Sequence, residues 1–203
     1  AYSGNSLTVS VKKSPVPELK NLVIGLDAGH GGSASGAVSP SGLIEKELNL
    51  SMVYILKEEL EKRGAKVVLS RSEDKDVSMA ERKEIFEKEN IDLLISVHCN
   101  AGGNPLNPLG TSTYYKHIEY RDLAETILKR LLEMDINSFG LVGNFNFSMN
   151  DPTNYPSVLV ETMFLSSLPD EEKMADPEFR RDLMKRVVKG LEDYLAKVKK
   201  SIK

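Results

Sequence analysis

Three short apolar segments of this chain each lead into a residue that can bind a metal or transfer a proton. Residues 22–30 read LVIGLDAGH, residues 92–98 read DLLISVH and residues 158–161 read VLVE. In open α/β sheets, ligands and catalytic groups gather outside the carboxyl ends of the parallel strands. Three strands that lead into histidine, histidine and glutamate therefore predict one shared site at that edge of a sheet.

The remaining periodicity predicts the fold class. Apolar residues at helical spacing indicate helices, whereas β-branched and apolar runs bounded by Gly, Pro and Asn indicate strands. The predicted strands are 22–26, 65–69, 92–97, 111–116 and 157–160, and the predicted helices are 45–62, 78–88, 120–134 and 178–198. Residues 137–156, rich in Asn, Gly and Phe, are expected to be irregular, with room for a short strand. The alternation predicts a three-layer α/β fold with a mixed, mainly parallel sheet of about six strands flanked by helices.

The domain organisation follows from length and from the prolines near the start. A chain of 203 residues is most simply one large domain. Leu7–Val11 alternates like a short strand, and Pro15 and Pro17 then indicate a linker. We therefore expect residues 1–20 to be the remnant of a joint and residues 21–203 to be the catalytic domain. The first residue is alanine, which is typical of a processed or trimmed chain.

Composition excludes some partners. The formal net charge is −3, so no electrostatic attraction to nucleic acid is expected. No segment is long and apolar enough to span a membrane, and no signal peptide is visible. Cys99 is the single cysteine, which excludes an internal disulfide bond.

The three histidines narrow the search for a metal site. A catalytic zinc ion usually has three protein ligands, histidines with or without a carboxylate, and one open position. His30 and His98 supply two imidazoles. The candidates for the third ligand are Asp27, Glu45, Glu47, His117 and Glu161.

Position on the predicted helix favours one of these candidates. Glu45 stands where the glycine-rich loop meets the helix and can face the loop, whereas Glu47 lies on a different helical face. Glu161 is then left for acid–base work. Each residue alone also has a purely structural interpretation: a hydrogen-bonded histidine, a helix-start glutamate or a surface ion pair. Cys99 is expected to be a small buried apolar residue, and His117 to lie in a solvated loop.

Several motifs together resemble a known family. DAGHGG, GLIEKELNL, SRSEDKDVSMAER, SVHCNA, GTSTYY and VLVETMFLSS occur in that order. They are similar to the zinc-dependent N-acetylmuramoyl-L-alanine amidases of the Amidase_3 type, over about residues 23–195. The resemblance implies that His30, Glu45 and His98 bind Zn²⁺ and that Glu161 is the catalytic glutamate.

The resemblance also implies a substrate and a place of work. The expected reaction is hydrolysis of the amide between N-acetylmuramic acid and L-alanine in peptidoglycan or muropeptides, in the periplasm or the cell wall. Zinc would activate water, with Glu161 as general base. Asp27 could orient a zinc histidine without itself binding the metal. Arg71 and Arg82 are expected to be structural ion-pair residues.

Two features of the sequence refine this expectation. The loop GGSASGAVS and the segment TMFLSSLPDE differ from the usual family sequences, which affects substrate fit more than the metal ligands.

Some members of the family carry an inserted helix that plugs the zinc site until an activator moves it. Neither residues 117–119 nor residues 137–156 suit such a helix, because the first stretch is too short and the second is rich in Gly, Asn and Pro. We therefore predict an open site and no obligatory activator.

Two other functions compete with amide cleavage in the cell wall. A zinc peptidase acting on free peptides would use the same metal ligands. A cell-wall binding module that has lost catalysis would retain the fold, but the presence of Glu161 argues against it.

Overall fold

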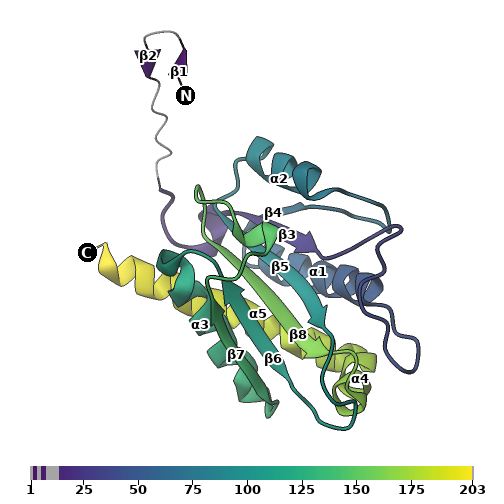
Figure 1. The fold of residues 1–203 in the computed structure, drawn as a ribbon. Helices are drawn as coiled ribbons and strands as arrows, with labels where there is room; N and C mark the ends of the chain where they lie inside the picture. Colours follow the sequence, from purple (N-terminus) through teal and green to yellow (C-terminus); the bar gives the residue numbers. More distant parts are fainter. Residues whose placement is uncertain (1, 4–5, 8–13, 203) are drawn as a thin grey trace.

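A six-stranded sheet forms the centre of the molecule (Figure 1). The computed structural model describes residues 2–3, 6–7 and 14–202. The strands of the sheet are β3 (Val23–Ala28), β4 (Lys66–Leu69), β5 (Leu93–Asn100), β6 (Thr111–Tyr115), β7 (Ser138–Gly143) and β8 (Ser157–Phe164). Their order across the sheet is β4-β3-β5-β8-β6-β7. All neighbouring pairs are parallel except β6 and β8, which are antiparallel. The predicted mixed, mainly parallel sheet is confirmed.

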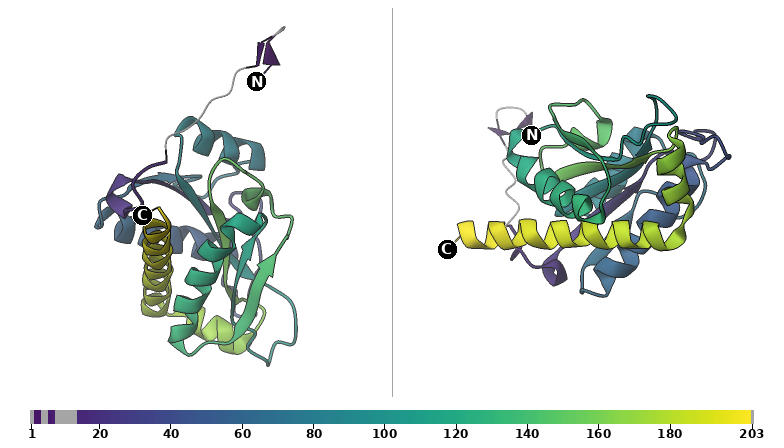
Figure 2. Two further views of the ribbon diagram at one scale, coloured as in Figure 1. Left: turned by 90° about the vertical axis from the view of Figure 1, so that its left-hand side faces the viewer. Right: turned by 90° about the horizontal axis from the view of Figure 1, so that it is seen from below.

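Helices cover both faces of this sheet, which makes three layers (Figure 2). The helices are α1 (Glu45–Glu61), α2 (Met79–Lys88), α3 (Arg121–Leu131), α4 (Leu168–Ala175) and α5 (Pro177–Ser201). Helices α1, α3 and α5 bury the larger apolar cluster against one face. Helix α2 and the 3-10 helix Ser148–Asn150 cover the other face with a smaller cluster that includes Phe86 and Met149. The thinner cover on the α2 face leaves room for a pocket there.

Local sequence explains the best-defined elements. Helix α1 buries Leu48, Met52, Leu56 and Leu60, which recur at helical spacing on one stripe. Helix α2 begins with a capping box, in which the Ser78 side chain accepts from the Glu81 amide and the Glu81 side chain accepts from the Ser78 amide. Strand β8 is buried along its whole length, as expected for a strand covered on both faces.

Two predicted strand ends were wrong, and one helix was not predicted. Strands β5 and β8 continue to Asn100 and Phe164, so His98 and Glu161 lie within strands rather than at their ends. The apolar residues that follow Glu161 extend its strand. Helix α4 was not predicted, although a proline in its first turn and two acidic residues favour a helix start there. The stretch 137–156 contains the short strand for which the sequence left room, the edge strand β7, parallel to β6.

The N-terminal prediction is mostly beyond the described residues. Only Leu7 of the predicted strand Leu7–Val11 is described, in β2 (Ser6–Leu7), which pairs antiparallel with β1 (Tyr2–Ser3). In the described part of the chain, no helix has both the length and the apolar character needed to cross a membrane.

Candidate metal centre

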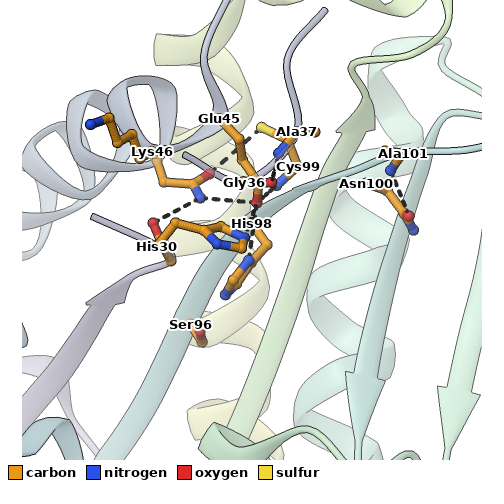
Figure 3. Close-up of polar contacts among 12 residues, drawn as sticks. His30, Gly36, Ala37, Glu45, Lys46, Ser96, His98, Cys99, Asn100 and Ala101 are labelled. Carbon is orange, nitrogen blue, oxygen red and sulfur yellow. Dashed lines mark hydrogen bonds and ion pairs between the residues drawn. The ribbon is translucent and has the colours of Figure 1, made fainter. Parts of the chain in front are cut away.

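Three side chains from separate elements meet beside the sheet. His30 comes from the loop after β3, Glu45 from the first residue of α1 and His98 from β5 (Figure 3). Glu45 Oε1 lies 3.2 Å from His30 Nε2 and 3.0 Å from His98 Nδ1. One ligand atom from each residue falls within 4.8 Å of the other two. Two imidazoles and one carboxylate at this spacing form a candidate metal site.

Glu45 is fixed and kept ionised by its neighbours. Its Oε1 accepts the backbone N–H of Cys99 at 3.0 Å and the amide of Asn49 at 3.2 Å, and its Oε2 accepts the N–H of Ala37 at 2.8 Å. Burial alone would raise the pKa of Glu45. The hydrogen bonds with His30 and His98, the charge of His98 and the Ala37 N–H together outweigh burial and hold this pKa far below its usual value. The group is therefore a preformed anion, the state that metal binding requires.

A buried arginine holds the backbone that carries His30. His30 has a φ of 61°, a left-handed conformation that is uncommon for a residue other than glycine. Arg82 Nη2 donates to the His30 carbonyl at 2.6 Å, and Arg82 Nη1 donates to the Ala28 carbonyl at 2.7 Å. Arg71 adds bonds to the carbonyls of Ala28 and Gly29 at 3.0 and 3.1 Å. These contacts fix the loop in the conformation that points His30 at Glu45.

Asp27 is the counter-ion of this arginine. Its Oδ1 lies 2.6 Å from Arg82 Nη1, and its Oδ2 accepts the Ser96 hydroxyl at 2.7 Å. Burial raises the pKa of Asp27, but the guanidinium of Arg82, the charge of His98 and the hydrogen bonds from Ser96 and Ser70 together outweigh burial and lower this pKa overall. Asp27 thus acts on His30 through Arg82 and the loop backbone, rather than by the direct contact with a histidine that the sequence suggested. Arg82 is an ion-pair residue, as expected, whereas the described bonds of Arg71 go to backbone carbonyls.

Glu161 lies beside His98 and is much less well paired than Glu45. The two residues are register partners on the adjacent parallel strands β5 and β8. Glu161 is 7% exposed, and its Oε2 has no hydrogen-bond partner among the described residues. Burial raises the pKa of Glu161 to about 7, with Glu45 adding repulsion and His98 and His30 opposing it. A carboxyl group with a pKa near neutrality can both take up and release a proton at physiological pH.

A pocket of about 480 Å³ opens over this cluster on the α2 face of the sheet. His30, Glu45, His98 and Glu161 all line it. Met79 of α2 and residues 147–149 form its walls. The pocket therefore presents the candidate metal ligands and Glu161 to the same bound molecule.

The other sequence candidates lie elsewhere. Glu47 is exposed, on a different face of α1 from Glu45. The His117 ring contacts the Asp151 carbonyl at 3.0 Å and the Tyr120 ring. Cys99 is buried, with its Sγ 3.3 Å from Thr162 Oγ1.

Sequence reasoning missed Asn49. This buried side chain donates both to Glu45 and, at 3.2 Å, to the Gly29 carbonyl. Its position four residues after Glu45, within the apolar stripe of the helix, was the available signal. A polar residue in such a stripe needs a partner when it is buried.

Comparisons with known proteins agree with this geometry. The sequence profile of Amidase_3, N-acetylmuramoyl-L-alanine amidase, matches residues 24–193. The chain is 34% identical over 200 residues to the N-acetylmuramoyl-L-alanine amidase LytC of Bacillus subtilis, covering 94% of this chain and 39% of LytC. It is 30% identical over 198 residues to YqiI of Bacillus subtilis, an uncharacterised protein, covering 96% of this chain and 95% of YqiI.

Solved structures share the fold. The N-acetylmuramoyl-L-alanine amidase AmiC2 of Nostoc punctiforme superposes with a TM-score of 0.81 at 30% identity, covering 86% of this chain and 97% of AmiC2. The CwlD amidase of Clostridioides difficile, solved in complex with the GerS lipoprotein, gives a TM-score of 0.82 at 26% identity, covering 87% of this chain and 99% of CwlD.

The match covers most of this chain but only part of several relatives. The chain spans 39% to 60% of the length of LytC, of AmiC from Neisseria meningitidis and of LytH from Staphylococcus epidermidis. The profile match nevertheless includes His30, Glu45, His98 and Glu161. On this basis the chain belongs to the Amidase_3 family of N-acetylmuramoyl-L-alanine amidases.

Proposed function

We propose that this chain hydrolyses the amide between the lactyl group of N-acetylmuramic acid and L-alanine in peptidoglycan, with zinc held by His30, Glu45 and His98. The observation that carries the proposal is the position of Glu161. An unpaired, buried carboxyl group lies on the strand adjacent to a His–Glu–His cluster, in the same pocket. That combination is what water-dependent amide cleavage at a metal requires.

The residues of the cluster fit zinc. Two imidazole nitrogens and one carboxylate oxygen are a donor set that catalytic zinc uses, and the lowered pKa of Glu45 keeps its carboxylate charged. Hydrogen bonds donated by Asn49 and by backbone N–H groups orient this carboxylate. A bound zinc ion would act as a Lewis acid toward the scissile carbonyl and lower the pKa of water.

Glu161 performs the proton transfers. Its carboxylate takes a proton from the attacking water and, as the carboxylic acid, gives it to the leaving amine of L-alanine. A pKa of about 7 suits both steps. The buried surroundings of Glu161 exclude bulk water, which would otherwise compete for its proton.

The place of work and the absence of an activator belong to the same proposal. Peptidoglycan lies outside the cytoplasmic membrane, so the enzyme acts in the periplasm or the cell wall.

The chain needs no obligatory activator, because helix α3 begins six residues after β6 ends and the residues between β7 and β8 form only a 3-10 turn. No α-helix in residues 14–202 lies over the pocket from either segment.

Muropeptide digestion with mass spectrometry tests the reaction. The zinc-loaded chain should separate intact glycan from stem peptides that begin with a free L-alanine amine. Glu161→Gln should keep zinc but lose roughly 10²- to 10⁴-fold in turnover, whereas the matched change at an exposed carboxylate, Glu47→Gln, should have no effect. Cleavage within the stem or of sugar-free peptides would indicate a peptidase, and binding without any cleavage would indicate a cell-wall binding module.

A further inference from the structure

Two phenylalanines form an aromatic surface beside the catalytic pocket. Phe145 and Phe147 follow strand β7, and their ring centroids lie 4.5 Å apart. Phe147 lines the pocket, and Phe145 is 46% exposed. This pair of rings therefore offers an apolar surface to a molecule bound in the pocket.

Both rings rest on a buried tyrosine. Tyr114 of β6 makes edge contacts with Phe145 at 5.4 Å and with Phe147 at 5.2 Å. The Tyr114 carbonyl accepts the amide of Asn150 at 3.1 Å, which ties the following turn to the same strand. The two phenylalanines therefore pack against a buried residue of the sheet.

Sheet register places Tyr114, on which the phenylalanines pack, close to Glu161. Tyr114 is the direct partner of Leu159 on β8, and Glu161 lies two residues further along that strand on the same face. Two residues of a strand span about 7 Å. A group joined to the scissile carbonyl by a short ether link can reach the phenylalanines while the carbonyl lies at Glu161.

Charge decides which side of the amide faces them. The pocket wall formed by Phe147, Ser148 and Met149 carries no ionisable side chain, and the lining of the pocket in the described chain includes no lysine or arginine. The nearby cations Lys83 and Lys116 both pair with Asp151. A stem peptide carries at least its C-terminal carboxylate, for which this wall offers no counter-charge. N-acetylmuramic acid has no charge once its carboxyl group is in the amide.

We propose that Phe147, supported by Phe145 and Tyr114, forms the subsite for the pyranose ring of N-acetylmuramic acid. The apolar C–H face of the sugar stacks on the negative face of the aromatic ring. The peptide stem then leaves the pocket away from Phe147. This inference rests on the proposed amidase activity and adds the residue that recognises the sugar.

Two substrates with the same scissile amide test the assignment. One is a muramyl tripeptide, and the other replaces the sugar by a bare lactyl group. Phe147→Ala should lower kcat/KM for the muramyl substrate about 3- to 10-fold, the range of a single aromatic contact, and leave the lactyl substrate unchanged. Phe147→Tyr should keep the sugar preference, and Phe147→Leu should lose most of it.

Phe139→Ala is the matched control. Phe139 is a second exposed phenylalanine, on β7, whose ring packs on Phe164 and does not line the pocket. This variant should treat both substrates as the wild type does. Thermal unfolding of each variant checks that the fold is intact.

The possible outcomes distinguish an error in the sugar subsite from an error in the proposed reaction. Equal losses on both substrates, or no loss on either, would overturn the sugar subsite while leaving the amidase intact. A wild-type chain that cleaves neither substrate would overturn the proposed function instead. If the wild type cleaves only the muramyl substrate, the affinity of the muramyl substrate is measured instead, on zinc-loaded protein that carries Glu161→Gln. Added to this variant, Phe147→Ala must weaken binding and Phe139→Ala must not.

Discussion

Removing the charge of Glu161 should stabilise the metal-free protein, and only at neutral and alkaline pH. The folded-state pKa of about 7 lies above the ordinary value of 4.5, because burial penalises the carboxylate. A carboxyl group whose pKa is raised by folding contributes stability that is fully present below pH 4.5. That contribution is lost as the pH rises through 7, since folding then forces an ionised group into the pocket. Glu161→Gln has no charge to bury and escapes this loss.

The size of the effect follows from the shift. A difference between pKa values of 4.5 and about 7 corresponds to about 3 kcal/mol once both states are ionised. The part that develops between pH 5 and pH 8 is about 2 to 3 kcal/mol. The free energy of unfolding of Glu161→Gln minus that of the wild type should rise by this amount over that interval.

The assay is urea unfolding of chelator-treated protein at pH 5, 6, 7 and 8. Metal must be absent, because a cation at His30, Glu45 and His98 would favour the carboxylate form of Glu161. Glu47→Gln, at an exposed position, is the control and should give a difference that does not change with pH. If the Glu161→Gln difference is flat or falls with pH, Glu161 is not a buried group of raised pKa, and the reasoning is refuted.

Three further predictions concern the ligands, the loop and regulation. Gly29→Ala should lose zinc, because a Cβ at Gly29 would lie 2.3 to 2.5 Å from ring atoms of His98; retention of one zinc per chain after dialysis against a weak chelator would contradict this. Arg82→Met should lower the free energy of unfolding by about 3–5 kcal/mol, because it leaves the Asp27 carboxylate buried and unpaired. Urea titration should show that adding Asp27→Asn to the Arg82→Met variant restores part of this loss. A loss below about 1 kcal/mol for Arg82→Met alone would go against the prediction. The purified, zinc-loaded chain should digest peptidoglycan unaided, and a folded, loaded protein that stays silent until a partner is added would count against an open site.

Much of the fold could be predicted because its signals are local. The apolar stripe of α1 and the capping residues of α2 each act within a few residues, so periodicity and spacing reveal them. The convergence of His30 and His98 was also predictable, because parallel strands bring their carboxyl ends to one edge. Glu45 could be preferred over Glu47 because helix periodicity turns these two residues to different faces.

The rest depends on contacts between distant segments. The end of strand β8 past Glu161 depends on a partner from another segment, because Phe164 pairs with Asn100 of β5. Asp27 looked like a partner for a histidine, but a buried carboxylate needs a full counter-charge, and Arg82, 55 residues away, supplies it. Phe147 lies in a segment without periodicity, and its place in the pocket depends on Tyr114 of another strand.

Anomalous diffraction at the zinc absorption edge, from crystals of protein purified without chelator, tests the central claim most directly. We predict one strong peak, bound by a nitrogen of His30, a nitrogen of His98 and an oxygen of Glu45 at about 2.0–2.2 Å, with the Glu161 carboxyl group nearby and not among the ligands. A peak elsewhere in the molecule, or one in which Glu161 replaces Glu45 as a ligand, would contradict the account.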